Sequence, residues 1–496
     1  MNDATLQVRA DAPIGTISPR LYGHFAEHIG RCCYDGLWTG ADATDVNHEG
    51  GFRRDVLDVL RALPVPLLRW PGGCYADHYH WRDGIGAPGA RPRRLGMSCG
   101  LTVEDDNGLG THEFLQLCAL IGAEPYLAGN VGTGTPQELC DWLEYCNSPL
   151  NTNLTRERQA NGASAPFGVA LWGVGNENWG CGGNYDAVTY ALEYRRYATM
   201  LRHVDVNAQL VVCGEDDDWN IALLATLGRR IDLVDHLSIH QYWFNGGPET
   251  AFDDAGYYQL LTQAADTEGF IRRTAAIIED ATGGTHPIGI ALDEWGVWHP
   301  EARRLGYGGI PGRRPITYEQ AGTLRDALAA AIALEGFHRQ CNVLSMANLA
   351  QIVNVLHAPV MTGRDGGRMW LTPTYHVLRM HAAHIGATAL PVEITNGDTV
   401  PGDAPAVSGT ASVKDGQITM TIINRHLTGA ASVRLRGITG GGTATGTVLT
   451  ADSSRIQNAA DTPDLVTPRA LDVRRDTGAD WRIELPAHSV ATLTFA

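Results

Sequence analysis

Two glutamates in this chain follow apolar segments and lie next to tryptophans. Glu177 stands in LWGVGNENWGCGG, which begins at Leu171, and Glu294 stands in IGIALDEWGVW, which begins at Ile288. Two carboxyl groups that face each other across a bound sugar can cleave a glycosidic bond, because one protonates the leaving oxygen while the other attacks the sugar carbon. A single glutamate at a strand end is more often solvated or ion-paired, so this chemistry requires a fold that brings the two together.

Eight short apolar runs alternate with helical patterns along the first three quarters of the chain. The runs are LYGHF at Leu21, LLRWPGG at Leu67, EPYLAGN at Glu124, ALWGVGNE at Ala170, QLVVCG at Gln209, HLSIHQYW at His236, IGIALDEW at Ile288 and NVLSMANL at Asn342. Strands that alternate with helices pair in parallel. Eight such units predict an α/β fold of the closed (β/α)8 TIM barrel type. The fourth and seventh strands lie across the mouth of such a barrel, so Glu177 and Glu294 are expected to face each other.

Three of the intervening segments carry clear helix patterns. Residues 52–63 place apolar side chains on one stripe. Thr135 is a predicted N-cap, and Glu138 three residues later predicts a capping box. An Ala- and Leu-rich helix is predicted over residues 318–337.

Further polar side chains stand at the predicted strand ends, where a barrel of this type binds its substrate. They are Glu27 after the first strand, Arg69 and Cys74 after the second, Asn130 after the third, Asn176 after the fourth, His240 and Tyr242 after the sixth, and Gln351 after the eighth. Amides and hydroxyls could hold sugar hydroxyls. Plainer interpretations stay open: Asn176 could cap the next helix, His240 could be a hydrogen-bonded core histidine, and Trp298 could be a packing residue.

The pattern of apolar and polar residues changes after about residue 384. Helical stripes stop, and period-2 patterns appear, as in Ile418, Met420 and Ile422. These features predict an all-β sandwich at the C-terminus. The expected domains are a catalytic barrel over residues 16–384, a β-sandwich over 385–496, and an N-terminal strand within 1–15 that joins the sandwich.

The net charge and the N-terminal sequence indicate which partners and which cellular location to expect for the protein. The net charge is −17 at pH 7, which disfavours nucleic acid and anionic membrane surfaces as partners. No apolar run approaches the roughly 18 residues of a membrane span. The opening residues MNDATLQVRADAP lack the basic and apolar regions of a signal peptide. We therefore expect a cytoplasmic protein that acts on neutral substrates.

The possible metal ligands are few. The ten cysteines form no CxxC pair, which disfavours structural zinc and thioredoxin-like chemistry, and in the cytoplasm we expect them to be reduced. His78 and His80 lack an evident third ligand. The acidic run at 215–218 lacks the spacing of an EF-hand loop. The sequence predicts no metal and no cofactor.

The motifs around the two glutamates resemble those of a known family. GNENWGCGG and LDEWGVW, together with LRWPGGCYADHYHWRDGIG and LYGHFAEHIGRCCYDGLW, are similar to motifs of the α-L-arabinofuranosidases of glycoside hydrolase family 51. The resemblance runs from about Ile14 to the C-terminus. It implies a barrel with a β-sandwich, and a retaining exo-acting enzyme that releases terminal α-L-arabinofuranosyl residues from arabino- and arabinoxylo-oligosaccharides. It also implies a homo-oligomer, commonly a hexamer.

The resemblance implies roles for individual residues. Glu177 matches the acid/base, Glu294 matches the nucleophile, and Asn176 matches a residue that binds the 2-hydroxyl. Side chains around the arabinofuranosyl ring are implied at Glu27, Arg69, His240, Tyr242 and Gln351, with an aromatic wall at Trp298.

Two cysteines depart from the pattern of the family. Cys74 stands where many members have Asn, so we expect it to bind substrate as a weaker hydrogen-bonding partner. Cys99 stands where many relatives place a Trp that lines the leaving-group side.

Two other functions stay open at this stage. A β-glycanase or β-xylosidase of the same clan would use the same pair of carboxylates, and a sugar-binding protein on a barrel scaffold would not turn over its ligand.

Overall fold

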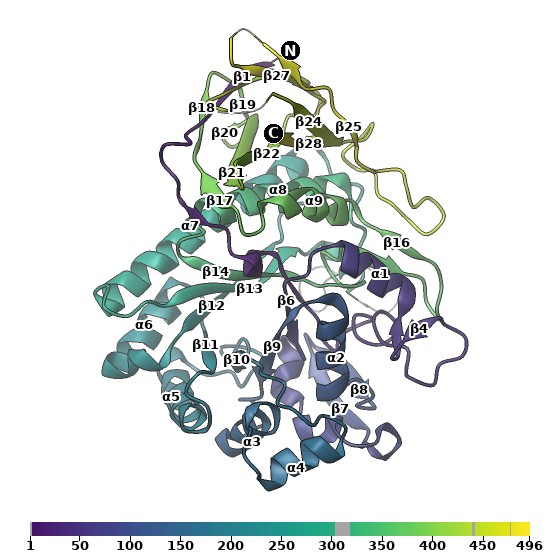
Figure 1. Cartoon of the computed structure of the whole chain (residues 1–496), viewed down its shortest axis with the longest axis vertical. Helices are drawn as coiled ribbons and strands as arrows, with labels where there is room; N and C mark the ends of the chain where they lie inside the picture. The colour runs from purple at the N-terminus through teal and green to yellow at the C-terminus, as the bar shows by residue number, and fades with distance from the viewer. Residues whose placement is uncertain (1, 303–317, 439–441, 477) are drawn as a thin grey trace.

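A closed eight-stranded parallel barrel forms the centre of the molecule (Figure 1). The computed structural model describes residues 2–302, 318–438, 442–476 and 478–496. The barrel strands are β3 (Gly23–Phe25), β6 (Leu67–Trp70), β9 (Glu124–Gly129), β10 (Leu171–Val174), β11 (Gln209–Cys213), β12 (His236–Trp243), β13 (Gly289–Val297) and β14 (Leu344–Ala350). All eight predicted runs therefore contribute a strand, and the TIM-barrel prediction is confirmed.

The interior of the barrel is filled by side chains, as in other barrels of this type. One fully buried cluster lies inside it and consists of Leu67, Tyr126, Leu171, Val211, Ala291 and Met346. The strands have short apolar sequences because both of their faces are covered, one by this cluster and the other by the surrounding helices. Only their C-terminal ends can then present polar side chains to a ligand.

The helices of the described residues surround the barrel or lie beneath the C-terminal sheets (Figure 1). They are α1 (Arg54–Ala62), α2 (Thr111–Ile121), α3 (Pro136–Asn147), α4 (Asn153–Ala160), α5 (Ala187–Val204), α6 (Asp217–Leu227), α7 (Asp254–Thr282), α8 (Leu324–Arg339) and α9 (Pro373–His381). Thr135 caps α3 as predicted, since its hydroxyl accepts the N–H of Glu138 at 3.2 Å. The predicted capping box does not close, because the Glu138 carboxylate contacts His80 Nδ1 at 2.8 Å instead.

The predicted start of the Ala- and Leu-rich helix is wrong. Helix α8 begins at Leu324 rather than at Tyr318, because Thr323 is the N-cap and has an extended backbone. The Asp326 carboxylate accepts the N–H of Thr323 at 2.9 Å and closes a capping box there. The signal T-x-x-D was present in the sequence, and it ends the non-helical segment that precedes the helix.

Two antiparallel-rich sheets form the C-terminal part of the chain. One contains β18 (Val392–Thr395), β1 (Asn2–Val8), β23 (Ala431–Arg436), β27 (Trp481–Leu485) and β26 (Arg474–Arg475). The other contains β2 (Gly15–Thr16), β17 (Thr388–Leu390), β21 (Val407–Lys414), β22 (Gln417–Asn424), β28 (Ser489–Phe495), β24 (Ala444–Leu449) and β25 (Arg469–Ala470). Ile418, Met420 and Ile422 all lie in the core between the sheets, as their period-2 spacing predicts.

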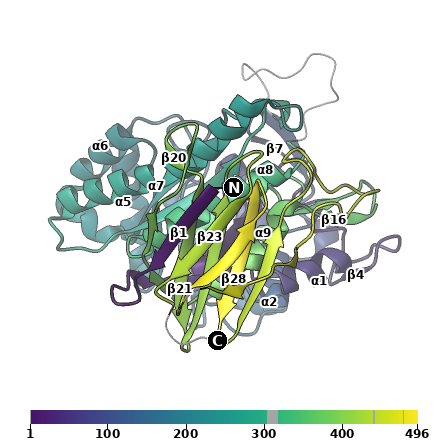
Figure 2. The ribbon, with the colours of Figure 1, turned by 90° about the horizontal axis from the view of Figure 1, so that it is seen from above.

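The N-terminal strand lies inside this sandwich. Figure 2 shows the purple β1 beside β23 among green and yellow strands. Leu6 lies opposite Ile394 of β18 on one side and opposite Leu435 of β23 on the other. The first residues of the chain therefore complete a sheet made from its last hundred residues. The exact domain limits at residues 15 and 384 stay a prediction.

Shorter strands extend from the barrel and from the sandwich. They are the pairs β4 (His48–Glu49) with β5 (Phe52–Arg53), β7 (Arg94–Ser98) with β8 (Leu101–Asp105), β15 (Val360–Thr362) with β16 (Met369–Leu371), and β19 (Thr399–Val400) with β20 (Ala404–Pro405). In the described part of the chain, no helix has both the length and the apolar character needed to cross a membrane.

Three buried histidines lie where the barrel meets the sandwich. His338 lies in the last turn of α8, His381 ends α9 and His384 follows in a 3₁₀ turn, with ring centroids 4.9–6.3 Å apart. His338 and His384 contact hydroxyls of the sandwich, from Thr410 of β21 at 3.0 Å and Ser412 of β21 at 2.8 Å. Burial lowers the pKa of all three rings, that of His381 to about 4.

This cluster makes the stability of the protein depend on pH. A histidine whose pKa is lowered by folding stabilises the folded state above its unfolded pKa of about 6.5, and this contribution is lost as pH falls below that value. Replacing His381 by Leu should therefore reduce the loss of stability between pH 6.5 and 4, by up to about 1.4 kcal/mol per pH unit. Denaturant unfolding at pH 7, 6 and 5 would measure the difference.

The exposed His203 of α5 offers a matched control. His203→Leu should follow the pH dependence of the wild type. The predicted role of the cluster would be contradicted if the difference in unfolding free energy between His381→Leu and the wild type were the same at every pH.

Candidate active site

Glu177 and Glu294 face each other at the mouth of the barrel. A carboxylate oxygen of Glu177, a carboxylate oxygen of Glu294 and a ring nitrogen of His240 all lie within 4.8 Å of one another. His240 Nδ1 is 2.8 Å from Glu177 Oε1 and 3.6 Å from Glu294 Oε2. The side chain of Glu177 is 19% exposed and that of Glu294 is 7% exposed. The pair therefore has one carboxyl that solvent reaches more easily and one that is almost enclosed.

Strand register explains why His240 accompanies Glu294. Strands β12 and β13 are parallel neighbours, and His240 is paired with Glu294 after a one-residue irregularity that follows Ile239. Such an irregularity changes the direction in which the next side chains point. Glu177 follows β10 at φ +41°, in the left-handed region, so the chain turns sharply just where this carboxylate enters the mouth.

Glu294 is held as an anion. Arg69 Nη1 donates to its Oε1 at 2.9 Å, and the Tyr242 hydroxyl donates to its Oε2 at 2.7 Å. Burial raises the pKa of the Glu294 carboxyl, but the positive charges of His240 and Arg69 outweigh burial and hold the pKa below its usual value. The same partnership raises the pKa of His240 against the effect of burial. An ionised carboxylate is the form that can attack carbon.

Arg69 also orients Asn176. Its Nη2 donates to Asn176 Oδ1 at 2.5 Å, which turns the amide so that Nδ2 is the free end. Among the described residues, Asn176 Nδ2 is a buried donor without a protein acceptor. A buried amide is rarely left without a partner, so this N–H group is available to a ligand oxygen. Arg69 itself is 1% exposed, and its Cζ lies 4.8 Å from the centroid of the Phe25 ring.

Glu27 forms a second buried carboxylate beside the pair. It accepts the N–H of Tyr75 at 3.0 Å, the hydroxyl of Ser98 at 2.5 Å and Nε2 of Gln351 at 3.1 Å. Burial and the charge of Glu294 raise the pKa of Glu27 to about 7, although its hydrogen bonds act in the opposite direction. Gln351 Oε1 is buried and, in the described part of the chain, has no protein donor.

A glycine makes room for Glu27. A Cβ at Gly73 would lie 2.7 Å from a carboxylate oxygen of Glu27, which is closer than real Cβ contacts. The double glycine of the WPGG motif thus lets the loop after β6 pass directly over this carboxylate.

Aromatic rings border one side of the mouth. The Tyr242 and Trp298 rings pack edge to face with their centroids 5.0 Å apart, and the centroid of the Phe244 ring lies 5.7 Å from that of Trp298. The indole N–H of Trp298 donates to the carbonyl of Ala302 at 3.0 Å, which fixes the plane of the ring. Trp295 has a different place: it is 1% exposed and packs against Phe337 as a core residue.

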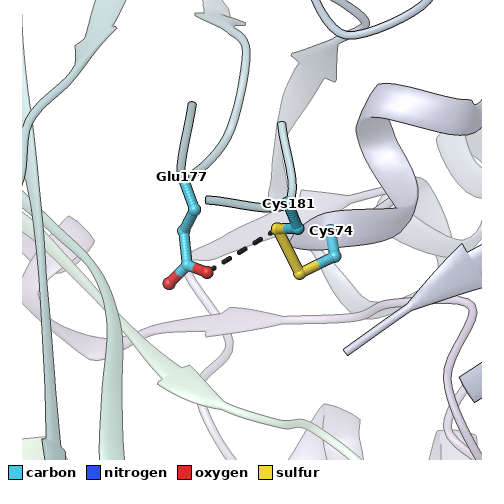
Figure 3. A group of neighbouring side chains, drawn as sticks. All are labelled: Cys74, Glu177 and Cys181. Atoms are coloured by element: carbon cyan, nitrogen blue, oxygen red, sulfur yellow. Dashed lines mark hydrogen bonds between the residues drawn. A yellow bond between two sulfur atoms is a disulfide. The ribbon is translucent and has the colours of Figure 1, made fainter. Parts of the chain in front are cut away.

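The expectation that all cysteines are reduced is wrong for two of them. Cys74, at the start of the 3₁₀ turn η2 (Cys74–His78), is joined by a disulfide to Cys181, with Cα atoms 5.5 Å apart (Figure 3). Cys74 is therefore bonded to a second sulfur and is not the free thiol expected to bind substrate. Spacing could not reveal the pair, because 107 residues separate the two cysteines and their loops meet only through the parallel pairing of β6 and β10 with β9.

Asp77 is a buried residue of the site that no sequence pattern singled out. Its Oδ1 accepts the N–H groups of Val131 at 2.7 Å and Gly132 at 2.8 Å, and its Oδ2 accepts the N–H of Asn176 at 3.2 Å. Burial raises the pKa of Asp77 to about 7, in spite of these hydrogen bonds. This one carboxylate joins the loops that follow β6, β9 and β10, and so fixes the backbone that precedes Glu177.

Asp293 was missed as well. It precedes Glu294, and its side chain accepts the Tyr126 hydroxyl at 2.8 Å and Nδ2 of Asn348 at 3.2 Å. Its Oδ2 lies 3.9 Å from Nε of Arg69. The acidic pair in the LDEW motif was the available signal. Successive strand residues normally point to opposite faces, but the register of β13 with β14 shifts between Leu292 and Trp295, and both acids lie beside Arg69.

Some strand-end residues serve the loops instead of the site. Asn130 Oδ1 accepts the N–H groups of Thr133 and Gly134, both at 2.9 Å, so it shapes the loop after β9. His80 pairs with Glu138, as noted above. Asp216 of the acidic run accepts the N–H of Trp219 at 2.9 Å and caps α6.

The remaining predicted residues gather at the mouth of the barrel. Hydrogen bonds and ion pairs connect Glu177, His240, Glu294, Tyr242, Arg69 and Asn176, and Trp298 borders them through Tyr242. Glu27 and Gln351 form a separate hydrogen-bonded pair that the charge of Glu294 influences. The site combines an anionic carboxylate, a more exposed carboxyl, free amide atoms and an aromatic border. These groups can form hydrogen bonds with a small neutral polyol and exchange protons with it.

Comparison with known proteins identifies the family. Residues 59–258 match the model of the alpha-L-arabinofuranosidase 1 domain, and residues 293–489 match that of the alpha-L-arabinofuranosidase C-terminal domain. An intracellular exo-alpha-L-arabinofuranosidase of Bacteroides ovatus is 38% identical over 504 residues, which cover 99% of this chain and 95% of the relative. An exo-alpha-(1->6)-L-arabinofuranosidase of Bifidobacterium longum is 33% identical over 452 residues, or 87% of this chain and 84% of the relative.

A solved structure has the same fold over the full length of both chains. The family 51 arabinofuranosidase of Xanthomonas axonopodis pv. citri matches with a TM-score of 0.92 and 34% identity, covering 100% of each chain. The barrel, the sandwich and the sequence motifs therefore all agree, and this chain belongs to the α-L-arabinofuranosidases of glycoside hydrolase family 51.

Proposed function

We propose that the protein is an exo-acting, retaining α-L-arabinofuranosidase in which Glu294 is the nucleophile and Glu177 is the acid/base. The observation that carries the proposal is the carboxylate pair itself, whose nearest ligand atoms lie within 4.8 Å. Retaining glycosidases place their two carboxyl groups about 5–5.5 Å apart, whereas inverting enzymes leave about 6.5–9.5 Å for a water molecule between them. The short separation therefore favours attack by a side chain over direct attack by water.

In the first step, Glu294 attacks the anomeric carbon of a terminal arabinofuranoside. Arg69 and Tyr242 keep this carboxylate ionised and aim it, so the group need not lose a proton before it reacts. Glu177 gives a proton to the departing oxygen, which its greater exposure toward the leaving-group side permits. Asn176 Nδ2 and Gln351 Oε1 supply a donor and an acceptor for hydroxyls of the sugar.

In the second step, water releases the sugar from Glu294. Formation of the ester removes a negative charge close to Glu177, which favours the ionised form of Glu177. The glutamate that acted as an acid then acts as a base and takes a proton from the attacking water. His240 contacts both carboxylates, so it can hold the two side chains in place through both steps.

We infer that the substrates are short arabino- and arabinoxylo-oligosaccharides. The relatives named exo-acting arabinofuranosidases support a substrate that presents a terminal sugar, and the rings of Tyr242 and Trp298 beside Glu294 offer it an apolar border. The β-glycanase or β-xylosidase alternative and the non-catalytic sugar-binding alternative are disfavoured, because the matching relatives are named arabinofuranosidases and both carboxylates are present.

The location and assembly are extensions of this proposal. We propose action inside the cell, which the name of the Bacteroides ovatus relative supports. A reducing cytoplasm would favour the thiol form of Cys74 and Cys181. The homo-oligomer implied by the family resemblance stays a prediction, which light scattering of the purified protein would test.

Replacing Glu294 by Ala should abolish turnover. Loss of a nucleophile removes the covalent route, so kcat on an aryl α-L-arabinofuranoside should fall on the order of 10⁴-fold or more. Glu393→Ala, which removes an exposed carboxylate of the sandwich, should leave kcat unchanged. Turnover near the wild-type level in Glu294→Ala would refute the nucleophile assignment.

Replacing Glu177 by Ala should affect substrates according to their leaving groups. Oligosaccharides need protonation of the departing oxygen and should lose about 10²–10⁴-fold in kcat/KM, while an aryl substrate with a good leaving group should lose much less. Azide should restore turnover of the aryl substrate and yield an arabinofuranosyl azide of retained configuration. Equal losses on both substrates without azide rescue would rule out Glu177 as the acid/base.

A further inference from the structure

Three sulfur atoms lie one after another beside the Glu177 carboxylate, with that of Cys74 in the middle. Cys74 Sγ is bonded to Cys181 Sγ and lies 3.7 Å from Cys99 Sγ, which belongs to a free thiol. Cys181 Sγ in turn lies 3.7 Å from Glu177 Oε2 (Figure 3). A disulfide sulfur carries no hydrogen, so Cys181 cannot donate a hydrogen bond to this carboxylate while the Cys74–Cys181 bond is intact.

Cys99 approaches Cys74 from the side away from Cys181. The ligand atoms of Cys74, Glu177 and Cys181 lie within 4.8 Å of one another, and in the described part of the chain no such group contains Cys99. Because Cys74 is close to both other cysteines, the sulfurs of Cys99 and Cys181 must themselves lie more than 4.8 Å apart. A thiolate attacks a disulfide sulfur from the side opposite the sulfur that leaves, so Cys99 is placed to attack Cys74 and displace Cys181.

The turn that carries Cys99 is anchored to the site. Cys99 lies between β7 and β8 at φ +45°, in the left-handed region that tight turns use. The Ser98 hydroxyl donates to Glu27 Oε1 at 2.5 Å, and the Tyr318 hydroxyl donates to the carbonyl oxygen of Cys99. These two contacts hold the main chain of the turn and keep the Cys99 thiol next to Cys74.

Solvent reaches the two outer sulfurs of the series. Among the free cysteines of the described residues, Cys99 is partly exposed and the others are buried. Cys181 is partly exposed as well, whereas the shared Cys74 is buried. Water can therefore take a proton from Cys99 and return one to Cys181, while the sulfur that both can bind stays enclosed.

We propose that Cys74 is shared between two disulfide partners, and that the thiol of Cys99 displaces Cys181 from it within the folded enzyme. Cys99 gives its proton to solvent, and its sulfur attacks Cys74 Sγ. The Cys74–Cys99 bond forms as the Cys74–Cys181 bond breaks, and the electron pair of the broken bond leaves on Cys181, which takes up a proton. One disulfide and one thiol are present before and after the step, so it consumes neither oxidant nor reductant.

The exchange places a thiol next to Glu177. A thiol at Cys181 can donate a weak hydrogen bond to Glu177 Oε2, across the 3.7 Å that separates the two atoms. This bond would favour the ionised form of Glu177 and so weaken it as a proton donor. The inference rests on the proposed function in this respect, because Glu177 is the proposed acid/base. The sulfur exchange itself does not depend on the role of Glu177.

Neighbouring carboxylates make the exchange slow at neutral pH. Burial and the charges of Glu27, Glu177 and Glu294 raise the pKa of the Cys99 thiol well above its ordinary value, and Ser98 acts in the opposite direction. Only the thiolate attacks, so the rate should rise about tenfold per pH unit while the thiol form predominates. The rearrangement should therefore be slow near pH 7 and much faster at pH 9.

Thiol labelling of the full-length wild-type protein tests the exchange directly. Protein is incubated at pH 7 and at pH 9 without reductant, acidified to stop further exchange, unfolded and labelled with a maleimide. Before incubation, peptide mass spectrometry should find the label on Cys99 together with the Cys74–Cys181 peptide pair. After incubation at pH 9, label on Cys181 and the Cys74–Cys99 pair should appear in equal amounts, at a rate that does not depend on protein concentration.

Substitutions show which sulfurs take part. Cys99→Ser removes the attacking thiol, so only the Cys74–Cys181 pair should be found at either pH. Cys181→Ser leaves Cys74 and Cys99 as thiols, which oxidised glutathione should join in a disulfide as it is itself reduced to two thiols. Cys140→Ser removes a buried thiol of α3 and is the matched control, which should rearrange like the wild type.

The catalytic consequence is measured on the same samples after return to pH 7. As the Cys74–Cys99 pair accumulates, kcat/KM on an arabino-oligosaccharide should fall, by up to about tenfold for complete rearrangement, which corresponds to one weak hydrogen bond to a charged group. An aryl α-L-arabinofuranoside with a good leaving group needs less help from an acid and should lose less.

The outcomes keep the two proposals apart. The exchange is refuted if the label stays on Cys99 at pH 9, or if the rate rises with protein concentration, which would indicate exchange between molecules. Rearrangement that leaves the ratio of the two activities unchanged would uphold the exchange and refute its effect through Glu177. The acid/base role itself is decided separately, by azide rescue of Glu177→Ala.

Discussion

The buried guanidinium of Arg69 is the interaction on which the site depends. A cation that is 1% exposed is costly unless it is paired, and Arg69 is paired with Glu294 at 2.9 Å while Asp293 lies 3.9 Å away. Its Nη2 group binds Asn176. One side chain of β6 thus fixes the anion on β13 and the amide after β10. Loss of this cation would remove the one arginine that lies beside the buried carboxylates of both Glu294 and Asp293.

The closed barrel makes this arrangement possible. Arg69, Asn176 and Glu294 come from strands that are not neighbours in the sequence and are not all neighbours in the sheet. Closure brings their C-terminal ends to one opening, and the buried interior layer keeps the strands in register. Asp77 then joins three consecutive loops with one carboxylate, so that the turn carrying Glu177 and Cys181 has a fixed start.

The sequence predicted the strands of the barrel and most of the pocket, because both follow local rules. Apolar runs that end in polar residues locate the strands, and barrel geometry places the residues after them at one mouth. Asp77 and the Cys74–Cys181 pair could not be predicted in this way. Their partners lie in loops whose paths depend on tertiary packing, so no spacing in the chain reveals them. The start of α8 was missed for a local reason, since the T-x-x-D capping signal at Thr323 was outweighed by helix-favouring residues before it.

The position of β1 has a consequence for how the chain is made. Leu6 lies between Ile394 and Leu435, so β1 leaves the ribosome hundreds of residues before either of its partner strands. During that time its apolar side chains and both of its edges are unpaired, which is the condition under which strands recruit wrong partners. Contacts of such long separation also form slowly. All eight barrel strands are synthesised in that interval, and β1 can pair only after β18 and β23 have followed them.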